Sequence, residues 1–237
     1  MESLTRFLQN TEMFENFPDI ILQREIIPFG YLREYPKGHF LIMPQQKVES
    51  FGIILSGKVH ILHIFAGGIQ SLMNDVTAGE IVGIDLVCTR KQISPYHAMA
   101  AAATHVFYLP IYILTSPGFL REDIRLSCLG RLLTLISNEN MKKEYRLAIL
   151  SQKGLRERIM TYLRMQSARR GKTTFAISFS REELADFLCV NRSALSHELS
   201  LMQQEGLIQF RKNVFTVCPE ALPQETAESC RLPRKER

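Results

Sequence analysis

The stretch SREELADFLCVNRSALSHELSLMQQEGLIQF, which runs from Ser180 to Phe210, decides the fold of the C-terminal part of this chain. Ser180 and Glu183 predict a capping box at the start of a first helix, because the hydroxyl and the carboxylate each accept a hydrogen bond from a free backbone N–H. Asn191 predicts the N-cap of a second helix, which ends near Gly206. Only LCVN separates the two helices, so they must cross steeply, as in a helix-turn-helix.

The second helix has two different faces. Its inward face is apolar, whereas the outward side chains at its start are small, polar or basic: Arg192, Ser193, Ser196 and His197. In a helix-turn-helix this end enters the major groove of DNA, where arginine binds guanine through two hydrogen bonds and serine and histidine donate one. The alternative is a helical pair that only packs and happens to expose an arginine.

A β-hairpin is predicted after the second helix. The segment GLIQFRKNVFTV alternates apolar and polar residues around RKN, and this places Arg211 and Lys212 at the tip, where a wing contacts a phosphate. Helix N-termini add backbone N–H groups for a further phosphate. The predicted DNA-binding residues are therefore Ser180, Asn191, Arg192, Ser193, Ser196, His197, Arg211 and Lys212.

The positive charge is concentrated in the same part of the chain. Residues 1–149 contain 14 Lys/Arg and 14 Asp/Glu, whereas residues 150–237 contain 15 Lys/Arg and 10 Asp/Glu. The whole net charge of +5 therefore belongs to the last third. Such an excess indicates a polyanionic partner.

The N-terminal half has the pattern of an all-β domain. From Tyr31 to Leu114, glycine and proline interrupt β-branched and aromatic runs such as FGIILSGKVHILHIF at short intervals, which indicates a sandwich or a small barrel. Gly67 and Gly68, between VHILHIF and IQSLMNDV, predict a two-residue hairpin turn.

A long helix is predicted from Phe119 to Leu150, where apolar residues recur at helical spacing. This length favours pairing with a second copy as a dimer axis; the alternative is a helix packed along its own barrel. A shorter helix is predicted over Leu155–Gln166, followed by a basic loop in which Gly171 stops the helix. The predicted parts are a sensor barrel (1–118), a dimerisation helix (119–150), a helix-turn-helix domain (151–218) and a flexible tail (219–237).

Several classes of protein are disfavoured. The five cysteines are scattered and form no CxxC pair, which argues against a disulfide framework, a zinc knuckle and a clustered iron–sulfur site. The first residues lack the pattern of a secretory signal, and no apolar run is long enough to cross a membrane. We expect a cytoplasmic protein with reduced thiols and no membrane partner.

The quoted segments together resemble the catabolite activator protein / fumarate–nitrate regulator (Crp/Fnr) family of bacterial transcription regulators. EELADFLCVNRSALSHELSLMQQEGLI is similar to the family's DNA-reading motif, and SFGIILSGKVHILHI and AGEIVGIDLV are similar to its sensor barrel. The resemblance covers about Tyr31 to Val217. It implies an α+β fold with an N-terminal cyclic-nucleotide-binding-type β jelly-roll barrel, a long dimerisation helix and a C-terminal winged helix-turn-helix.

The reading helix departs from the family's pattern. Ser193 stands where the family often has glutamate, and His197 stands where it usually has arginine, so we expect a different base preference. Cys189 stands where a glycine is frequent in the turn. If this position requires a positive φ, the cysteine carries strain of about 1 kcal/mol or more.

The sensor region departs further. Family members that bind cyclic AMP hold its ribose with a Gly-Glu pair and its phosphate with an Arg-Ser/Thr pair, where this chain has Gly83-Ile84 and Ser94-Pro95. A buried phosphate would lack a charged partner, so cyclic AMP is not expected as the effector. We place Asp85 on a strand, where it would point away from the face of Ile84. The residues expected to line a pocket for another effector are Gly83, Ile84, Asp85, Ser94, Tyr96, Ser137 and Asn138.

Metal and haem sites find little support in the sequence. His60 and His63 are three residues apart on a predicted strand and so face opposite sides of it. Cys88 or Cys128 could sense oxidants, although an inert buried thiol is the simpler interpretation.

The sequence therefore predicts a homodimeric transcription regulator without enzymatic activity, which binds a palindromic site in double-stranded DNA. An unidentified effector in the barrel controls it, no cofactor is expected, and RNA polymerase is a further candidate partner. One variant of this prediction is a homodimeric regulator that works without an effector. The alternatives are a ligand-binding signalling module that acts on a protein partner without reading DNA, and a metal-dependent enzyme on a double-sheet barrel.

Overall fold

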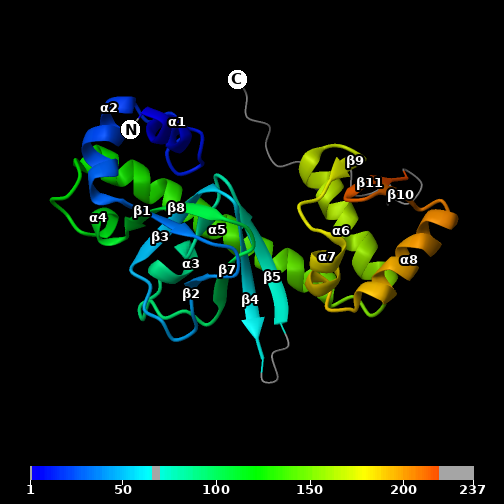
Figure 1. Ribbon diagram of the computed structural model, residues 1–237. Helices are drawn as coiled ribbons and strands as arrows, with labels where there is room; N and C mark the ends of the chain where they lie inside the picture. Colours follow the sequence, from blue (N-terminus) through cyan, green and yellow to red (C-terminus); the bar gives the residue numbers. More distant parts are fainter. Residues whose placement is uncertain (1, 66–69, 219–237) are drawn as a thin grey trace. The chain divides into compact units, whose positions relative to one another are not determined.

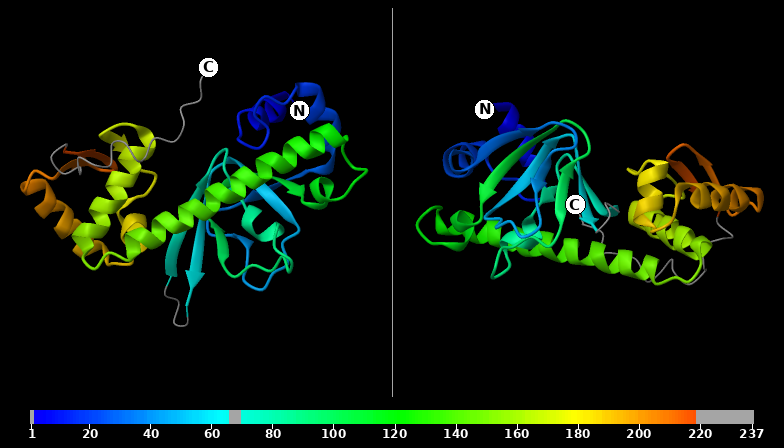
Figure 2. Two further views of the ribbon diagram at one scale, coloured as in Figure 1. Left: turned by 180° about the vertical axis from the view of Figure 1, so that it is seen from behind. Right: turned by 60° about the horizontal axis from the view of Figure 1, so that its bottom comes forward.

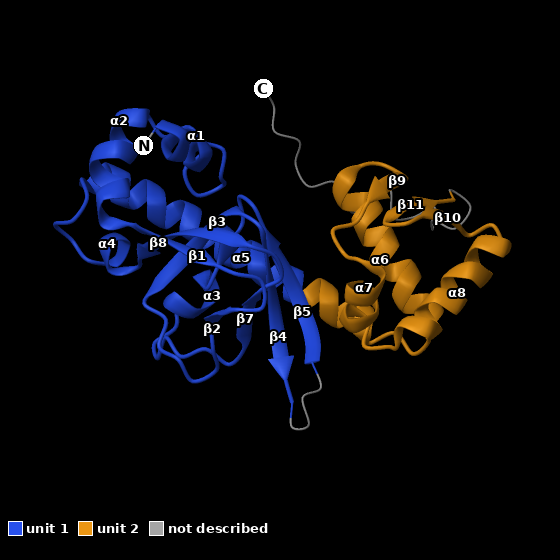
Figure 3. Cartoon of the chain, viewed as in Figure 1, with its two compact units in different colours: residues 1–143 blue, residues 144–237 orange. Residues whose placement is uncertain are grey.

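The computed structural model describes residues 2–65 and 70–218 and divides into two compact units (Figure 3). Unit 1 comprises residues 1–143 and unit 2 comprises residues 144–237, so the border lies within the long helix α5 (Glu122–Leu150). The turn predicted at Gly67 and Gly68 and the tail predicted at 219–237 lie outside the described residues. The predicted borders at residues 118 and 150 stay predictions.

Two four-stranded sheets form the jelly-roll barrel of unit 1, as the sequence predicts (Figure 1). The first sheet has the strand order β1 (Tyr31–Tyr35), β8 (Thr104–Pro110), β3 (Ser50–Ser56) and β6 (Ile81–Val82). The second sheet has the strand order β2 (Phe40–Ile42), β7 (His97–Ala100), β4 (Lys58–Ile64) and β5 (Gln70–Thr77). Neighbouring strands pair antiparallel in both sheets, so each can bury one face against the other.

The first sheet requires a glycine on its central strand. Phe51 and Phe107, on β3 and β8, are at most 1% exposed and belong to the barrel core. A Cβ atom at Gly52 would lie 2.6 Å from Cγ1 of Val106 and 2.9 Å from Cε1 of Tyr108. The neighbouring strand approaches too closely for any side chain at this position.

Short helical segments surround the barrel, and the sequence pattern did not predict them. They are α1 (Glu2–Gln9), α2 (Asp19–Ile21), the π turn η1 (Leu22–Ile26), the 3₁₀ turn η2 (Ile27–Phe29), α3 (Ile84–Val87) and α4 (Tyr112–Thr115). Arg131 of α5 donates hydrogen bonds to the backbone carbonyls of Glu12, over 3.0 Å, and Glu15. These bonds fasten the segment between α1 and α2 to the first half of α5, which runs along the barrel (Figure 2).

The helix α5 is apolar on two opposite faces. Ile124, Cys128 and Leu132 recur every four residues, are at most 9% exposed and pack on the barrel core. Leu126 and Leu133 project from the other side of the helix and are 56% and 67% exposed. The helix therefore packs along its own barrel and still leaves an apolar face in water.

Unit 2 is a winged helix-turn-helix, as predicted. Its three-stranded sheet has the order β10 (Ile208–Arg211), β11 (Val214–Val217) and β9 (Thr174–Ala176). Its helices after α5 are α6 (Leu155–Arg170), α7 (Arg181–Phe187) and α8 (Arg192–Gln204). The predicted end of α6 at Gln166 is wrong by one turn: the helix continues until Gly171, which adopts a left-handed φ of 62°.

The turn between α7 and α8 places a cysteine in the left-handed region. Cys189 has a φ of 56°, and the amide of the next residue, Val190, donates to the carbonyl of Ala185 over 3.0 Å. This conformation costs a residue with a Cβ atom about 1–2 kcal/mol. The strain that the sequence implied at this position is present.

The substitution Cys189→Gly should therefore raise the free energy of unfolding by about 0.5–1 kcal/mol, because the relief of strain exceeds the entropy that glycine gains in the unfolded chain. Cys88→Gly is the matched control: Cys88 is also exposed but has a φ of −91°. This control should lower the unfolding free energy by about 0.5–1 kcal/mol. Thermal unfolding measures both, and a Cys189→Gly variant that melts no higher than the parent would contradict the prediction.

Candidate nucleic-acid interface

Both helices of the helix-turn-helix begin with the predicted caps. The amide of Glu183 donates to the hydroxyl of Ser180 over 3.2 Å, and the amide of Ser180 donates to the carboxylate of Glu183 over 2.6 Å. The side chain of Asn191 accepts from the amide of Ala194 over 2.8 Å. Ser180 and Asn191 are exposed, so both helix starts are open to a ligand.

The start of α8 presents the predicted reading residues to solvent. Arg192, Ser193 and His197 are exposed, and Ser196 is half-buried. The hydroxyl of Ser193 donates to Oδ1 of Asn191 over 2.9 Å, so this serine takes part in the cap. Its oxygen remains able to accept a hydrogen bond.

Apolar packing and an ion-pair network hold α8 in place. Leu195 and Leu199 on its inner face are fully buried. Arg156 of α6 donates to Glu198 over 2.6 Å and to both carboxylate oxygens of Glu205 over 2.6 and 2.9 Å. The hydrogen bonds to Glu205 and Glu198 raise the pKa of Arg156. Sequence reasoning missed Arg156, because its partners lie 42 and 49 residues away.

The predicted wing is present. Arg211 pairs with Val214 at the end of the β10–β11 ladder, which leaves Lys212 and Asn213 as the turn. Lys212 has a φ of 55°. The side chains of Arg211 and Lys212 are exposed at this tip, where they can contact a phosphate.

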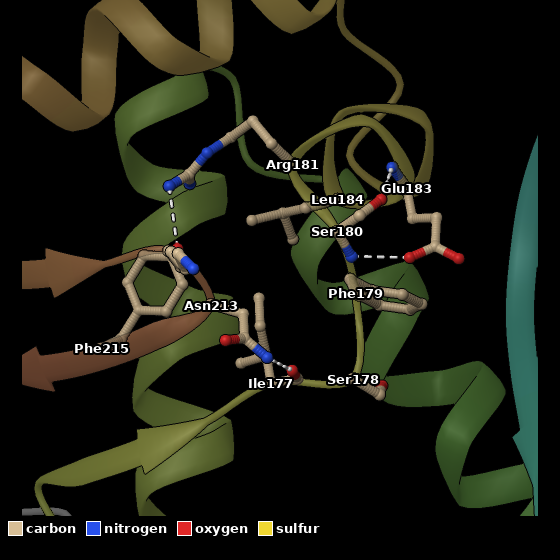
Figure 4. A pocket seen from close by; sticks show the side chains of 10 residues that line it. Ile177, Ser178, Phe179, Ser180, Arg181, Glu183, Leu184, Asn213 and Phe215 are labelled. Carbon is tan, nitrogen blue, oxygen red and sulfur yellow. Dashed lines mark hydrogen bonds between the residues drawn. The ribbon is translucent and has the colours of Figure 1, made fainter.

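A cavity of about 510 Å³ lies between the start of α7 and the wing turn (Figure 4). Its lining combines hydroxyl, amide and basic groups at the start of α7 and in the turn with apolar side chains. The lining residues are Ile177, Ser178, Phe179, Ser180, Arg181, Glu183, Leu184, Lys212, Asn213 and Phe215. Hydroxyl and basic groups beside a helix start suit contact with a sugar–phosphate backbone.

The predicted effector residues of the barrel meet at α3. The prediction that Asp85 lies on a strand is wrong, because Gly83 has a φ of 79° and turns the chain from β6 into α3. The hydroxyl of Tyr96 donates to Oδ1 of Asp85 over 2.7 Å, and Lys143 of α5 donates to Oδ2 over 2.8 Å. Ser94 is fully buried, and its hydroxyl donates to the backbone carbonyl of Tyr96 over 2.8 Å.

The remaining predicted effector residues differ in their surroundings. Ile84 is 2% exposed and belongs to the barrel core. Ser137 and Asn138 are exposed on α5, and the hydroxyl of Ser137 donates to the carbonyl of Leu133 over 2.9 Å. Asp85, Ser94 and Tyr96 are therefore brought together, whereas Ser137 and Asn138 face solvent in the single chain.

Other candidate sites are not assembled in the part of the chain that the structure describes. There, no group of three His, Cys, Asp or Glu side chains is arranged to hold a metal ion. Burial raises the pKa of the Cys128 thiol to about 12, which suppresses its thiolate. Cys88 is exposed, and its pKa is raised by desolvation and by the charge of Asp85. None of the described helices is both long and apolar enough to span a bilayer.

Two family models match the chain, one for each unit. Residues 32–112 match the model described as a cyclic nucleotide-binding domain, and residues 157–224 match the model described as a Crp-like helix-turn-helix domain. The transcriptional activator protein FnrA of Stutzerimonas stutzeri is 26% identical over 199 residues, which cover 82% of this chain and 78% of the relative. The transcriptional activator protein anr of Pseudomonas aeruginosa is 28% identical over 189 residues, which cover 78% of this chain and 74% of the relative.

Solved structures share the fold. FixK2 from Bradyrhizobium japonicum matches with a TM-score of 0.62 and 18% identity, over 79% of this chain and 92% of that chain. CLP from Xanthomonas campestris, a regulator that responds to c-di-GMP, matches with a TM-score of 0.61 and 16% identity, over 81% of this chain and 95% of that chain.

Proposed function

We propose that this chain, which belongs to the Crp/Fnr family of DNA-binding transcription regulators, works as a homodimer on a two-fold-related site in double-stranded DNA. The observation that carries the proposal is the capped start of α8, which presents Arg192, Ser193 and His197 to solvent beside a basic wing. In a homodimer, the two α8 helices would bind two half-sites whose centres are about ten base pairs apart.

The exposed residues suit distinct roles in DNA binding. Arg192 would bind a guanine through two hydrogen bonds, and His197 would donate one hydrogen bond to a base or a phosphate. Lys212 and Arg211 would contact the phosphate backbone from the wing. The absence of glutamate at Ser193 removes an acceptor for cytosine, so the operator should differ from the one that most relatives prefer.

The outward face of α5 supports dimerisation. Its exposed apolar side chains share one face of the helix: Leu126, Leu133 and Met141. Gly130 lies between them, and nothing lies within 4 Å of the position of an added Cβ there. A second copy of α5 would bury this face, with an expected gain of about 25 cal/mol for each Å² of apolar surface.

An effector in the barrel would act on α5 through Asp85. Lys143 binds Asp85, and Arg146, three residues later on α5, has its guanidinium 5.2 Å from the ring of Phe187 in α7. A change at α3 would therefore reach the helix that contacts the DNA-binding motif. We propose an effector other than cyclic AMP and recruitment of RNA polymerase as the outcome of DNA binding.

Substitutions at Arg192 and Lys212 should distinguish sequence-specific from non-specific DNA binding. Arg192→Ala should cost roughly 1–3 kcal/mol on a duplex selected from a random pool and flatten the preference at one base pair. Lys212→Ala should weaken selected and random duplexes alike and reduce the salt slope by about one. Fluorescence anisotropy over a salt series measures both. Equal losses on both kinds of DNA for both variants would contradict the assigned roles.

Substitution on the outward face of α5 should produce a monomer. Leu133→Glu places a charge at the centre of the proposed interface, where its burial is costly. Leu32→Glu is the matched control, because Leu32 lies on β1 and is similarly exposed, at 60%. Light scattering should give a dimer for the parent and the control and a monomer for Leu133→Glu. A dimeric Leu133→Glu variant at the same concentration would exclude α5 as the axis.

Cyclic AMP should not stabilise the protein. Ile84 and Ser94 are buried at the places where relatives that bind cyclic AMP have a carboxylate and a guanidinium, so the ribose and the phosphate would lack partners. Differential scanning calorimetry with increasing cyclic AMP should show no rise in melting temperature. A saturable rise, as expected for a ligand that binds only the folded state, would disprove this prediction.

A further inference from the structure

Arg181, the first residue of α7, connects the helix-turn-helix to the wing. Its guanidinium carbon lies 4.8 Å from the ring centroid of Phe210 and 5.5 Å from that of Phe215. Its Nη2 atom donates to the backbone carbonyl of Lys212 over 3.2 Å. Figure 4 shows the side chain reaching from the start of α7 to the turn between β10 and β11. One side chain thus contacts both strands of the wing and its turn.

The wing turn that Arg181 contacts is strained. Lys212 has a φ of 55°, a conformation that costs a non-glycine residue about 1–2 kcal/mol. The turn has only two residues, and both are exposed. The carbonyl that Arg181 holds belongs to the strained residue itself, and the two rings that it contacts are stacked with centroids 5.7 Å apart. The contacts therefore favour one position of the turn over others.

The chemistry of these contacts requires arginine. A planar guanidinium can lie against two rings and donate in its own plane at the same time, whereas a lysine ammonium cannot do both. The pKa of Arg181 is lowered, mainly by burial and to a smaller extent by the positive charge of Arg192. Arg181 is half-buried, so its guanidinium is partly withdrawn from water.

We propose that Arg181 is a positioning residue for DNA binding, which fixes the wing turn so that Lys212 contacts the backbone at a set distance from Arg192. This inference rests on the proposed function, because it assigns Arg181 an effect that passes through Lys212. It differs from a direct contact between Arg181 and a phosphate, which would need neither Phe210 nor Lys212.

A double-mutant cycle in the 237-residue chain tests the proposal. Arg181→Lys keeps the charge, and Phe210→Leu keeps an apolar side chain but removes the aromatic ring. Each should weaken binding to the selected duplex about three- to tenfold. In the Lys212→Ala background both losses should disappear, because the residue that they position is gone. Arg169→Lys, an exposed position in the last turn of α6, is the matched control and should change nothing.

Two results would overturn the proposal. If Arg181→Lys weakens binding equally with and without Lys212, or if Phe210→Leu has no effect, Arg181 contacts DNA itself or only stabilises the fold. Hydrogen exchange of the free protein gives an independent readout: the amides of Arg211 and Val214, the last pair of the β10–β11 ladder, should exchange faster in Arg181→Lys and Phe210→Leu than in the parent. Unchanged exchange would also reject the positioning role. A parent protein that binds no duplex would instead refute the proposed function, while the exchange measurement still tests the support of the wing.

Discussion

The orientation of the reading helix depends on the four residues between α7 and α8. Leu188 is fully buried, Cys189 adopts a left-handed φ of 56°, and Asn191 caps α8. The left-handed Cys189 redirects the chain between the helices, the apolar stripe of α8 packs against α7, and the capped start of α8 stays exposed. The exposure of the predicted DNA-binding residues is therefore a consequence of local backbone geometry, and the backbone strain at Cys189 is part of it.

The same turn is tied to α5. Arg146 is 9% exposed, and its Nη2 atom lies 3.5 Å from the carbonyl oxygen of Phe187 and 3.9 Å from Sγ of Cys189. Burial lowers the pKa of Arg146, because its guanidinium is removed from water. Any movement of the last turns of α5 therefore displaces a buried cation that touches the helix-turn-helix. Such a displacement is costly, so α5 and the turn should move together.

Local signals in the sequence predicted the elements of unit 2 well, because caps, a short turn and a two-residue hairpin each require particular residues close together. Ser180, Asn191 and the RKN turn are all of this kind. The prediction that Asp85 lies on a strand was wrong, because the alternation of apolar and polar residues cannot reveal that Gly83 turns the chain into a short helix. Sequence reasoning also missed Arg156 and Arg181, whose partners are 29 or more residues away and depend on how the helices and the wing pack.

The charges around α3 restrict what an effector can be. Asp85 already accepts from Tyr96 and Lys143, and Lys142 on the same face of α5 pairs with Glu80 and Glu139. An anionic effector would have to compete with Asp85 for Lys143 and would leave that carboxylate near another negative charge. A neutral or cationic molecule that replaces Lys143 as the partner of Asp85 would avoid this repulsion. The ion pair also holds α5 against α3, so an effector that binds Asp85 would have to break a contact that already exists.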